Sequence, residues 1–270
     1  MKTPRIFGQN VIETLQGQTQ PLDSGRFSND GDLPVALTEM MLKADEGMRI
    51  QVRPTRGIEW SREPVPVHLL PNEFRGVGYS LANVRRWRLY NPFYLDKQDA
   101  LNITLLNAGD DDLDLGMTIN GVKDSDVTNL PKYTWTPRIL YDGLHNEDAA
   151  ITSHTFDTMK LRNWGDRPMC VHAIAIIGLD GEPDFPWSHQ LNFDQFSLRI
   201  RLGGNLWMQN NEFVPVGALR AHWTNQIHIP NLWLKPDDAI YAQVQAQAAA
   251  EMRSIMIAVI GSVQNEVHKR

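Results

Sequence analysis

Apolar and polar residues alternate along several short stretches of the chain. Residues 48–53 read Met-Arg-Ile-Gln-Val-Arg, and residues 113–120 and 196–202 alternate in the same way. A period of two places the apolar side chains on one face, which predicts strands with one buried face. Gly203-Gly204-Asn205 follows the third stretch and leads into residues 206–208, which predicts a hairpin. The pattern therefore predicts an all-β protein built from antiparallel sheets.

One unit of turn and strand occurs twice. Residues 95–105 read LDKQDALNITL and residues 234–244 read LKPDDAIYAQV, each with a polar turn, Asp-Ala and an alternating run. Aspartate suits such a turn because its side chain can bond the nearby backbone. Pro92 and Pro230 stand shortly before the two copies. The recurrence prompts a search for the rest of a repeat.

Further matching segments follow in the same order in both halves of the chain. Residues 29–34 and 163–168 share the form Asn-x-Gly-Asp-x-Pro. The other matches are Trp60 with Trp207, residues 65–67 with 214–216, and residues 115–121 with 255–261. The differences in spacing fall in polar, Gly- and Pro-rich stretches, where loops tolerate insertion. We therefore predict two tandem antiparallel β-sandwich units related by internal duplication, with Leu101 and Ile240 at matching inward positions.

These matches predict four segments. Residues 1–26 precede the first match and are predicted to form an N-terminal arm that docks on its own domain or on a neighbour. Residues 27–121 form the first unit, and residues 156–270 form the second unit with a short polar tail. Residues 122–155 connect them, and because a structureless connection of this length is unusual, we expect it to pack at the junction.

Composition and charge narrow the class of protein. Hydrophobic residues make up 42% of the 270 residues, which is enough for a core. The net charge of −6 argues against a dedicated nucleic-acid-binding protein. The most basic cluster, residues 85–88 (Arg-Arg-Trp-Arg), is predicted to be the charged edge or solvent face of a strand. The N-terminus has no apolar signal region, and the apolar runs are too short to span a bilayer.

The candidate chemistry is sparse. The eight histidines form neither a His-x-His pair nor a His-Glu-x-x-His motif, and no nucleophile elbow, P-loop or dinucleotide fingerprint occurs. Cys170 is the single cysteine, which excludes an intrachain disulfide, and we expect a buried, inert thiol. Asp110-Asp111-Asp112 could attract a cation but is expected to be a solvated turn. We therefore predict no enzyme activity, no cofactor, and no catalytic, cofactor-binding or metal-binding residues.

Two collinear β-sandwich units, an N-terminal arm and a long central connection resemble the double jelly-roll coat proteins of tailless bacteriophages and related viruses. Residues 95–105 and 234–244 also resemble strands of jelly-roll capsid and head-decoration proteins of phages. Jelly rolls share shape more than residues, so the resemblance is one of layout. It implies a virion structural protein, a capsid shell subunit that forms trimeric, pseudo-hexameric capsomers. Its partners would be other copies of itself and other virion proteins, and it would be made in the host cytoplasm.

Two alternatives stay open beside the capsid subunit. The first is a phage head-decoration protein or a receptor- or carbohydrate-binding β-sandwich protein. Four tryptophans could stack on sugar rings if they were exposed, although tryptophans are buried by default: Trp187, Trp207, Trp223 and Trp233. The second is a cupin-like enzyme, which would need a His-x-His metal motif on a strand, and neither unit carries one.

Overall fold

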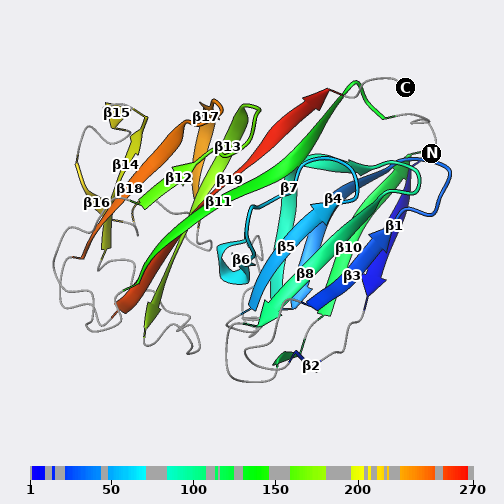
Figure 1. Ribbon diagram of the computed structural model, residues 1–270, viewed down its shortest axis with the longest axis horizontal. Helices are drawn as coiled ribbons and strands as arrows, with labels where there is room; N and C mark the ends of the chain where they lie inside the picture. Colours follow the sequence, from blue (N-terminus) through cyan, green and yellow to red (C-terminus); the bar gives the residue numbers. More distant parts are fainter. Residues whose placement is uncertain are drawn as a thin grey trace. The chain divides into compact units, whose positions relative to one another are not determined.

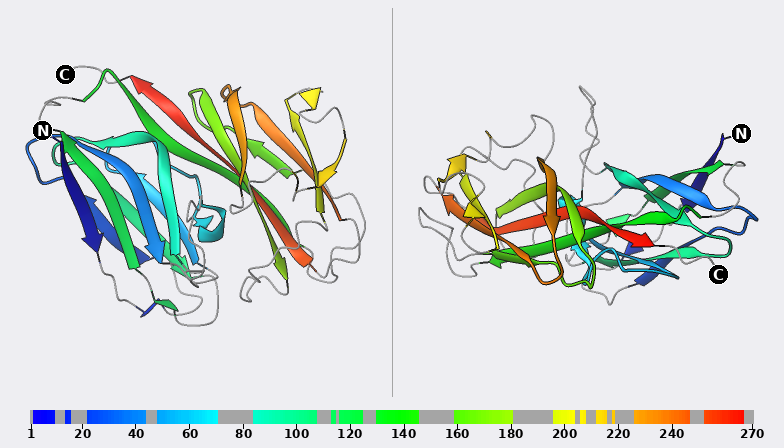
Figure 2. Two further views of the ribbon diagram at one scale, coloured as in Figure 1. Left: turned by 180° about the vertical axis from the view of Figure 1, so that it is seen from behind. Right: turned by 90° about the horizontal axis from the view of Figure 1, so that it is seen from above.

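The computed structural model divides the chain into two compact units. Unit 1 comprises residues Met1–Ile139 and Gly261–Arg270, and unit 2 comprises residues Leu140–Ile260. The boundary therefore falls within two long strands, β11 (Tyr133–His145) and β19 (Met252–Glu266). The structure describes residues 2–9, 14–15, 22–43, 48–70, 84–107, 113–114, 116–124, 130–145, 159–180, 196–203, 206–207, 212–215, 218, 226–246 and 252–266. Figure 1 shows the strands in the colours of the sequence, and Figure 2 shows them from behind and from above.

Unit 1 holds two main antiparallel sheets in its described residues. The first has the order β1 (Lys2–Gln9), β10 (Gly116–Asp124), β4 (Val35–Lys43), β7 (Val84–Leu95). The second has the order β3 (Leu22–Ser28), β8 (Ala100–Asn107), β5 (Met48–Pro54), β6 (Val65–Pro66). Lettered B to I along the chain, these strands give the orders B-I-D-G and C-H-E-F, which is the jelly-roll arrangement of two Greek keys. Three short elements accompany them: β2 (Thr14–Leu15), which pairs with β9 (Leu113–Asp114), and the 3₁₀ helix η1 (Val67–Leu69).

Unit 2 repeats this order in the part of it that the structure describes. One sheet runs β11 (Tyr133–His145), β19 (Met252–Glu266), β13 (Met169–Asp180), β17 (Gln226–Leu234). The other contains β12 (Met159–Arg162), β18 (Ala239–Ala246), β14 (Phe196–Leu202), β15 (Leu206–Trp207) and β16 (Val214–Pro215). Both β15 and β16 pair with β14, and β16 takes the F position. The predicted fold class, two tandem jelly-roll units related by duplication, is confirmed.

The strand registers confirm the predicted equivalence of Leu101 and Ile240. Leu101 on β8 lies opposite Phe27 on β3 and Pro54 on β5. Ile240 on β18 lies opposite Leu161 on β12 and Leu202 on β14, which are the corresponding strands. Both side chains are 0% exposed. The two copies of the turn-strand unit are therefore the same inward-facing strand of each sandwich.

Other matched segments also occupy equivalent places. Val65-Pro66 forms β6 and pairs with Arg49 and Ile50, while Val214-Pro215 forms β16 and pairs with Ser197 and Leu198. The hairpin after residue 202 is confirmed by the pairing of Arg201 with Trp207. Proline cannot donate to a strand ladder and is confined to edges and bulges, which suits these short strands.

Pro92 and Pro230 mark a bulge that occurs in both units. The pairing of β4 with β7 shifts between Leu37 and Glu39, and the pairing of β13 with β17 shifts between Val171 and Ala173. Each proline lies where the register skips, between Arg88 and Phe93 on β7 or between His228 and Leu232 on β17. Among the described strands, β7 and β17 end their sheets, and proline, which lacks an N–H, is tolerated at such edges and bulges.

The segment predicted as an N-terminal arm, residues 1–26, instead supplies strands to unit 1. Lys2–Gln9 pairs with β10 along its whole length, from Lys2 opposite Asp124 to Gln9 opposite Met117. Leu22–Ser28 forms β3 and pairs with β8. No period-two pattern is visible in residues 2–9, because Ile6 and Phe7 are adjacent and Pro4 and Gly8 interrupt the run.

The predicted connection, residues 122–155, also differs from the structure. Strand β10 extends to Asp124, and residues 133–145 form β11, a member of the β11-β19-β13-β17 sheet. Residues 136–140 are all buried, Arg138 among them, so this strand lacks the alternation of a half-buried strand. The units consequently do not have the predicted bounds of 27–121 and 156–270.

We expect Leu101→Ala to lower the free energy of unfolding by about 2–5 kcal/mol, because it opens a cavity in the core of unit 1. Ile240→Ala should remove the equivalent side chain from unit 2 at a comparable cost. Asn102→Ala, the next position on β8 and half-buried on the opposite face, should change stability by less than about 0.5 kcal/mol. Chemical denaturation followed by circular dichroism compares the three, and equal costs for Leu101→Ala and Asn102→Ala would contradict the register.

Candidate functional site

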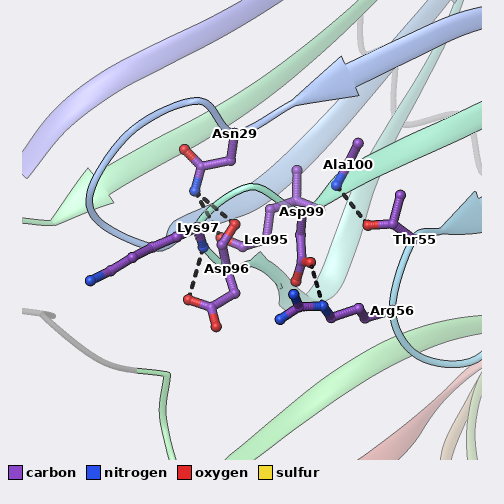
Figure 3. A network of polar contacts seen from close by, with 8 residues as sticks. All are labelled: Asn29, Thr55, Arg56, Leu95, Asp96, Lys97, Asp99 and Ala100. Atoms are coloured by element: carbon purple, nitrogen blue, oxygen red, sulfur yellow. Dashed lines mark hydrogen bonds and ion pairs between the residues drawn. The ribbon is translucent and has the colours of Figure 1, made fainter.

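The duplicated motifs of unit 1 meet around one buried asparagine. Asn29 is 4% exposed, and its Nδ2 donates hydrogen bonds to the carbonyl oxygens of Leu33 (2.9 Å), Leu95 (3.1 Å) and Asp96 (3.1 Å). Its Oδ1 accepts a bond of 3.3 Å from the Gly31 N–H. Figure 3 shows the Asn29 side chain pointing at the turn that carries Leu95 and Asp96. One side chain thus joins the loop after β3 to the turn between β7 and β8.

Unit 2 repeats the arrangement contact by contact. Asn163 is 0% exposed, and its Nδ2 donates to the carbonyl oxygens of Arg167 (2.9 Å), Leu234 (3.2 Å) and Lys235 (3.2 Å). Its Oδ1 accepts from the Gly165 N–H at 3.4 Å. We call each arrangement the asparagine clip: Asn29 with the turn 95–99, and Asn163 with the turn 234–238. The prediction that the two Asn-x-Gly-Asp-x-Pro turns are equivalent is confirmed.

Backbone hydrogen bonds complete each clip. The Asn29 N–H donates to the Asp99 carbonyl at 2.8 Å, and the Gln98 N–H donates to the Asn29 carbonyl at 2.9 Å. The same pairs in unit 2, Asn163 to Asp238 and Asp237 to Asn163, measure 2.8 and 2.9 Å. The clip therefore holds the turn through both the side chain and the backbone of the asparagine.

The turn held by each clip has an unusual backbone. Gln98 has φ 61° and Asp237 has φ 67°, in the left-handed region that favours glycine. Each is the third residue of a four-residue turn. In unit 1 the turn is closed by a hydrogen bond of 3.1 Å from the Asp99 N–H to the Asp96 carbonyl, and in unit 2 by one of 3.1 Å from the Asp238 N–H to the Lys235 carbonyl. Because the N–H of the left-handed residue bonds to the asparagine carbonyl, the clip offsets the strain of this conformation.

Charged side chains border the clip of unit 1. Asp99 forms an ion pair of 3.2 Å with Arg56, and the Ala100 N–H donates to Thr55 Oγ1 at 2.9 Å, as Figure 3 shows. Burial raises the pKa of Asp99, and the charge of Arg56 opposes this rise. The Thr55 side chain also hydrogen-bonds to Asp99. These contacts join the loop of Thr55 and Arg56 to the turn held by the clip.

The basic cluster of residues 85–88 lies on β7, an end strand of its sheet, as predicted. Trp87 is 2% exposed, and its ring meets the Trp60 ring edge-on at 5.4 Å. Arg86 and Arg88 point to the other face and pair with Glu39 Oε2 at 2.7 and 3.6 Å. Asn120 Nδ2 donates to Oε1 of the same carboxylate at 2.8 Å.

Glu39 is a buried carboxylate, 8% exposed, held between three donors. Burial raises its pKa, but the hydrogen bonds from Arg86 and Asn120 and the charges of Arg86 and Arg88 outweigh this, so its pKa is lowered. The cluster therefore joins three neighbouring strands, β10, β4 and β7, by charge as well as by backbone pairing.

A face rich in cations covers the outer side of strands β12, β18 and β14 in unit 2. Lys160, Tyr241 and Arg201 lie side by side across the three strands. The Lys160 Nζ lies 5.7 Å and the Arg201 Cζ 4.6 Å from the centre of the Tyr241 ring, within cation–π range. We call this surface the basic face, and it comprises Lys160, Arg162, Arg199 and Arg201.

The other two cations of the basic face also have defined contacts. Arg199 lies over the Phe213 ring at 4.5 Å and donates to Gln243 Oε1 through Nε at 3.0 Å. Arg162 Nη2 pairs with Asp237 Oδ1 at 2.7 Å. None of the motifs predicted from the sequence includes this face, although the alternation of Arg199 and Arg201 with buried Leu198 and Ile200 is visible in the sequence.

The single cysteine differs from its predicted burial. Cys170 on β13 is only partly buried, because the buried neighbours Met169 and Val171 point to the opposite face. Burial still raises the pKa of its thiol, so the thiol is less ionised than a fully exposed one. Its cross-strand neighbour is Trp233, which is 49% exposed.

The remaining candidates are placed as follows. Asp110–Asp112, Trp187 and Trp223 lie outside the described residues, and of Trp207 only the backbone is described. Within the described ranges, no group of three or more His, Cys, Asp or Glu residues is arranged to hold a metal ion. None of the described helical segments is long and apolar enough to cross a membrane.

No family model matches the chain, and no curated protein matches it. Among solved structures, the chain is similar to PBCV-1 VP54, whose crystal structure was fitted into a reconstruction of the virophage Sputnik. The identity is 9%, the TM-score is 0.48, and the match covers 100% of this chain and 97% of that chain. It is also similar to a chain of the PBCV-1 virus capsid, with 8% identity, a TM-score of 0.46 and the same coverage. The strand order of each unit independently defines the jelly roll.

We expect Asn29→Ala to lower the free energy of unfolding by about 2–3 kcal/mol, because one buried and two partly buried hydrogen bonds to carbonyl oxygens lose their donor. Asn29→Asp should cost more at neutral pH, because a buried carboxylate would then face those carbonyl oxygens. The extra cost should shrink in acid, where protonation restores one donor. Denaturation at several pH values tests this, with Asn102→Asp on the outer face of β8 as the control. An Asn29→Asp variant as stable as the wild type would refute the clip.

The lowered pKa of Glu39 predicts a pH-dependent contribution to stability. A carboxyl whose pKa is lowered by folding stabilises the protein above its unfolded-state pKa and loses that contribution as the pH falls through the folded-state value. Glu39→Gln should therefore be less stable than the wild type at neutral pH, and the difference should disappear in acid. Urea denaturation across this range measures it, and a difference independent of pH would count against the charge cluster.

Proposed function

We propose that the chain is a virion structural protein, a capsid shell subunit of the double jelly-roll type. The observation that carries this proposal is the presence, in one chain, of two jelly rolls with the same strand order and the same asparagine clip. Such a chain presents two similar building blocks. Three copies around a threefold axis would present six similar sandwiches, which gives the near-hexagonal outline that tiles a curved shell.

The edges of the sheets support association through side chains. Among the described strands, β7 and β17 end their sheets, and the edge of a sheet invites a partner strand unless it is blunted. Both strands carry the proline bulge described above, and β7 also carries Arg86 and Arg88, paired with Glu39. These features oppose the addition of a further strand. Many modest side-chain contacts repeated by symmetry suit the assembly of a closed shell.

The N-terminal residues enter this proposal differently from the sequence-based expectation. Because residues 2–9 pair with β10 of their own unit, we do not propose an arm exchanged between neighbours. The subunit contacts we propose are therefore between the sandwiches themselves. The partners remain other copies of the chain and other virion proteins, the place of action is the virion, and the role is structural.

One observation favours the alternative of a receptor- or carbohydrate-binding protein. Trp233 is 49% exposed on the end strand β17, and an exposed indole can stack on a sugar ring. The same exposed ring also suits a contact between protein subunits, where tryptophan is enriched. A direct assembly experiment separates these two uses of the surface.

We expect the purified protein to form trimers with a near-hexagonal outline, and shell fragments or closed shells at higher concentration. Negative-stain electron microscopy with light scattering measures both the outline and the mass. Trimers that bind preformed particles but never form shells would favour a decoration protein. A strictly monomeric protein that binds glycans, and loses this binding in Trp233→Ala, would overturn the capsid proposal in favour of the alternative.

A further inference from the structure

The two units share the same strand order and the same asparagine clip, but the loops and turns at the clip differ in charge. At the clip, unit 1 has Asp30 and Asp96 where unit 2 has Trp164 and Lys235. Asp30 and Asp32 are exposed and Asp96 is half-buried. Lys97 is exposed on the same turn, and Asp99 is paired with Arg56. We call Asp30, Asp32 and Asp96 the acidic end of unit 1.

The opposite difference occurs on the outer face of the C-H-E-F sheet. Unit 2 has Arg162 and Arg199 where the registers place Ser28 and Gln51 in unit 1. Gln51 is 4% exposed and donates to the carbonyl oxygens of Ser61 (3.2 Å) and Arg62 (3.0 Å), so it is committed to its own loop. Arg199 is only half-buried. Unit 1 has Arg49 where unit 2 has the buried Ser197, and Arg26 and Arg53 match Lys160 and Arg201. Among the described residues, this face therefore carries four cations in unit 2 and three in unit 1.

Carboxylates contact two positions of the four-cation basic face. Asp237 pairs with Arg162, and Asp142 accepts the backbone N–H of Lys160 at 3.0 Å. Arg199 and Arg201 contact Phe213, Gln243 and Tyr241. The chain as a whole is acidic, with 32 acidic and 26 basic residues. A second copy of the chain is accordingly a partner of complementary charge.

We propose that the basic face of unit 2 docks on the acidic end of unit 1 of a second copy. This inference rests on the proposed function and specifies the subunit contact in it. The two surfaces differ, so the contact is head-to-tail, and each copy uses both surfaces once. A contact of this type generates a closed ring when its rotation closes.

Both surfaces are held in place before they meet. The clip fixes the loop of Asp30 and Asp32 against the turn of Asp96. The Tyr241 ring holds Lys160 on one side and Arg201 on the other. Fixing side chains in advance lowers the entropy lost on association. The charges then determine which partner binds and in which orientation, which is the main effect of electrostatic complementarity at interfaces.

Charge reversal of the basic face tests the contact. We expect the double variant Lys160→Glu/Arg201→Glu to associate about tenfold or more weakly than the wild type, because like charges would face each other. The matched control is Arg26→Glu/Arg53→Glu, which makes the same change at the equivalent positions of unit 1. The control should associate as the wild type does. Sedimentation velocity measures association, and circular dichroism verifies that each variant is folded.

Reversal of the other partner should restore the contact. Asp30→Lys/Asp32→Lys alone should weaken association, and should regain most of it when combined in one chain with Lys160→Glu/Arg201→Glu. The Asp30→Lys/Asp32→Lys variant by itself still tests the contact if Arg201→Glu impairs folding, because the loop aspartates are exposed. Wild-type association should weaken from about 0.01 M to about 1 M salt, as the Debye length falls from about 30 Å to about 3 Å.

The outcomes separate this contact from the capsid proposal. A wild-type protein that assembles, with variants that assemble equally well, overturns the contact and leaves the capsid proposal standing. A wild-type protein that never associates at any salt concentration overturns the capsid proposal itself. Loss of binding to a single-stranded oligonucleotide in Lys160→Glu/Arg201→Glu, with unchanged self-association, would assign the basic face to nucleic acid and overturn our inference.

Discussion

Each half of this protein is organised around one buried asparagine side chain, whose amide must find hydrogen-bond acceptors. The Nδ2 groups of Asn29 and Asn163 are out of reach of bulk water, so their hydrogens must find acceptors within the fold. The acceptors lie in the asparagine's own loop and in a turn distant in sequence. That requirement fixes two loops together and sets where the next strand begins. Since strands have a period of two, a shift of one residue would turn Leu101 or Ile240 out of the core.

The second constraint is the open edge that every sandwich carries. Here the G-position strands, β7 and β17, each contain a proline in a bulge, so part of the edge cannot pair. The Glu39 cluster adds charge to β7 and ties it to the two strands beside it. Both devices favour discrete side-chain contacts over continuation of the sheet. A shell subunit benefits from this, because unlimited strand addition would give fibres instead of closed particles.

Duplication explains both what the units share and how they differ. The shared positions are those with a packing or hydrogen-bonding requirement: the clip asparagines, the buried residues of β8 and β18, and the edge prolines. The differing positions lie on exposed loops and outer faces, where substitution costs little stability. Asp96 and Lys235 illustrate this, because the clip uses only their backbone carbonyls and leaves their side chains able to change charge.

The sequence alone determined the fold class, the duplication and the inward positions of Leu101 and Ile240, because period two and collinear repeats are local properties of the chain. It did not reveal β1 or β11. Residues 2–9 become a strand through pairing with β10, and residues 136–140 are buried without alternation. Only the tertiary structure brought Asn29 to the turn 95–99 and aligned Lys160 with Arg201 across Tyr241. Such juxtapositions depend on strand register between distant segments, which hydrophobic patterning does not specify.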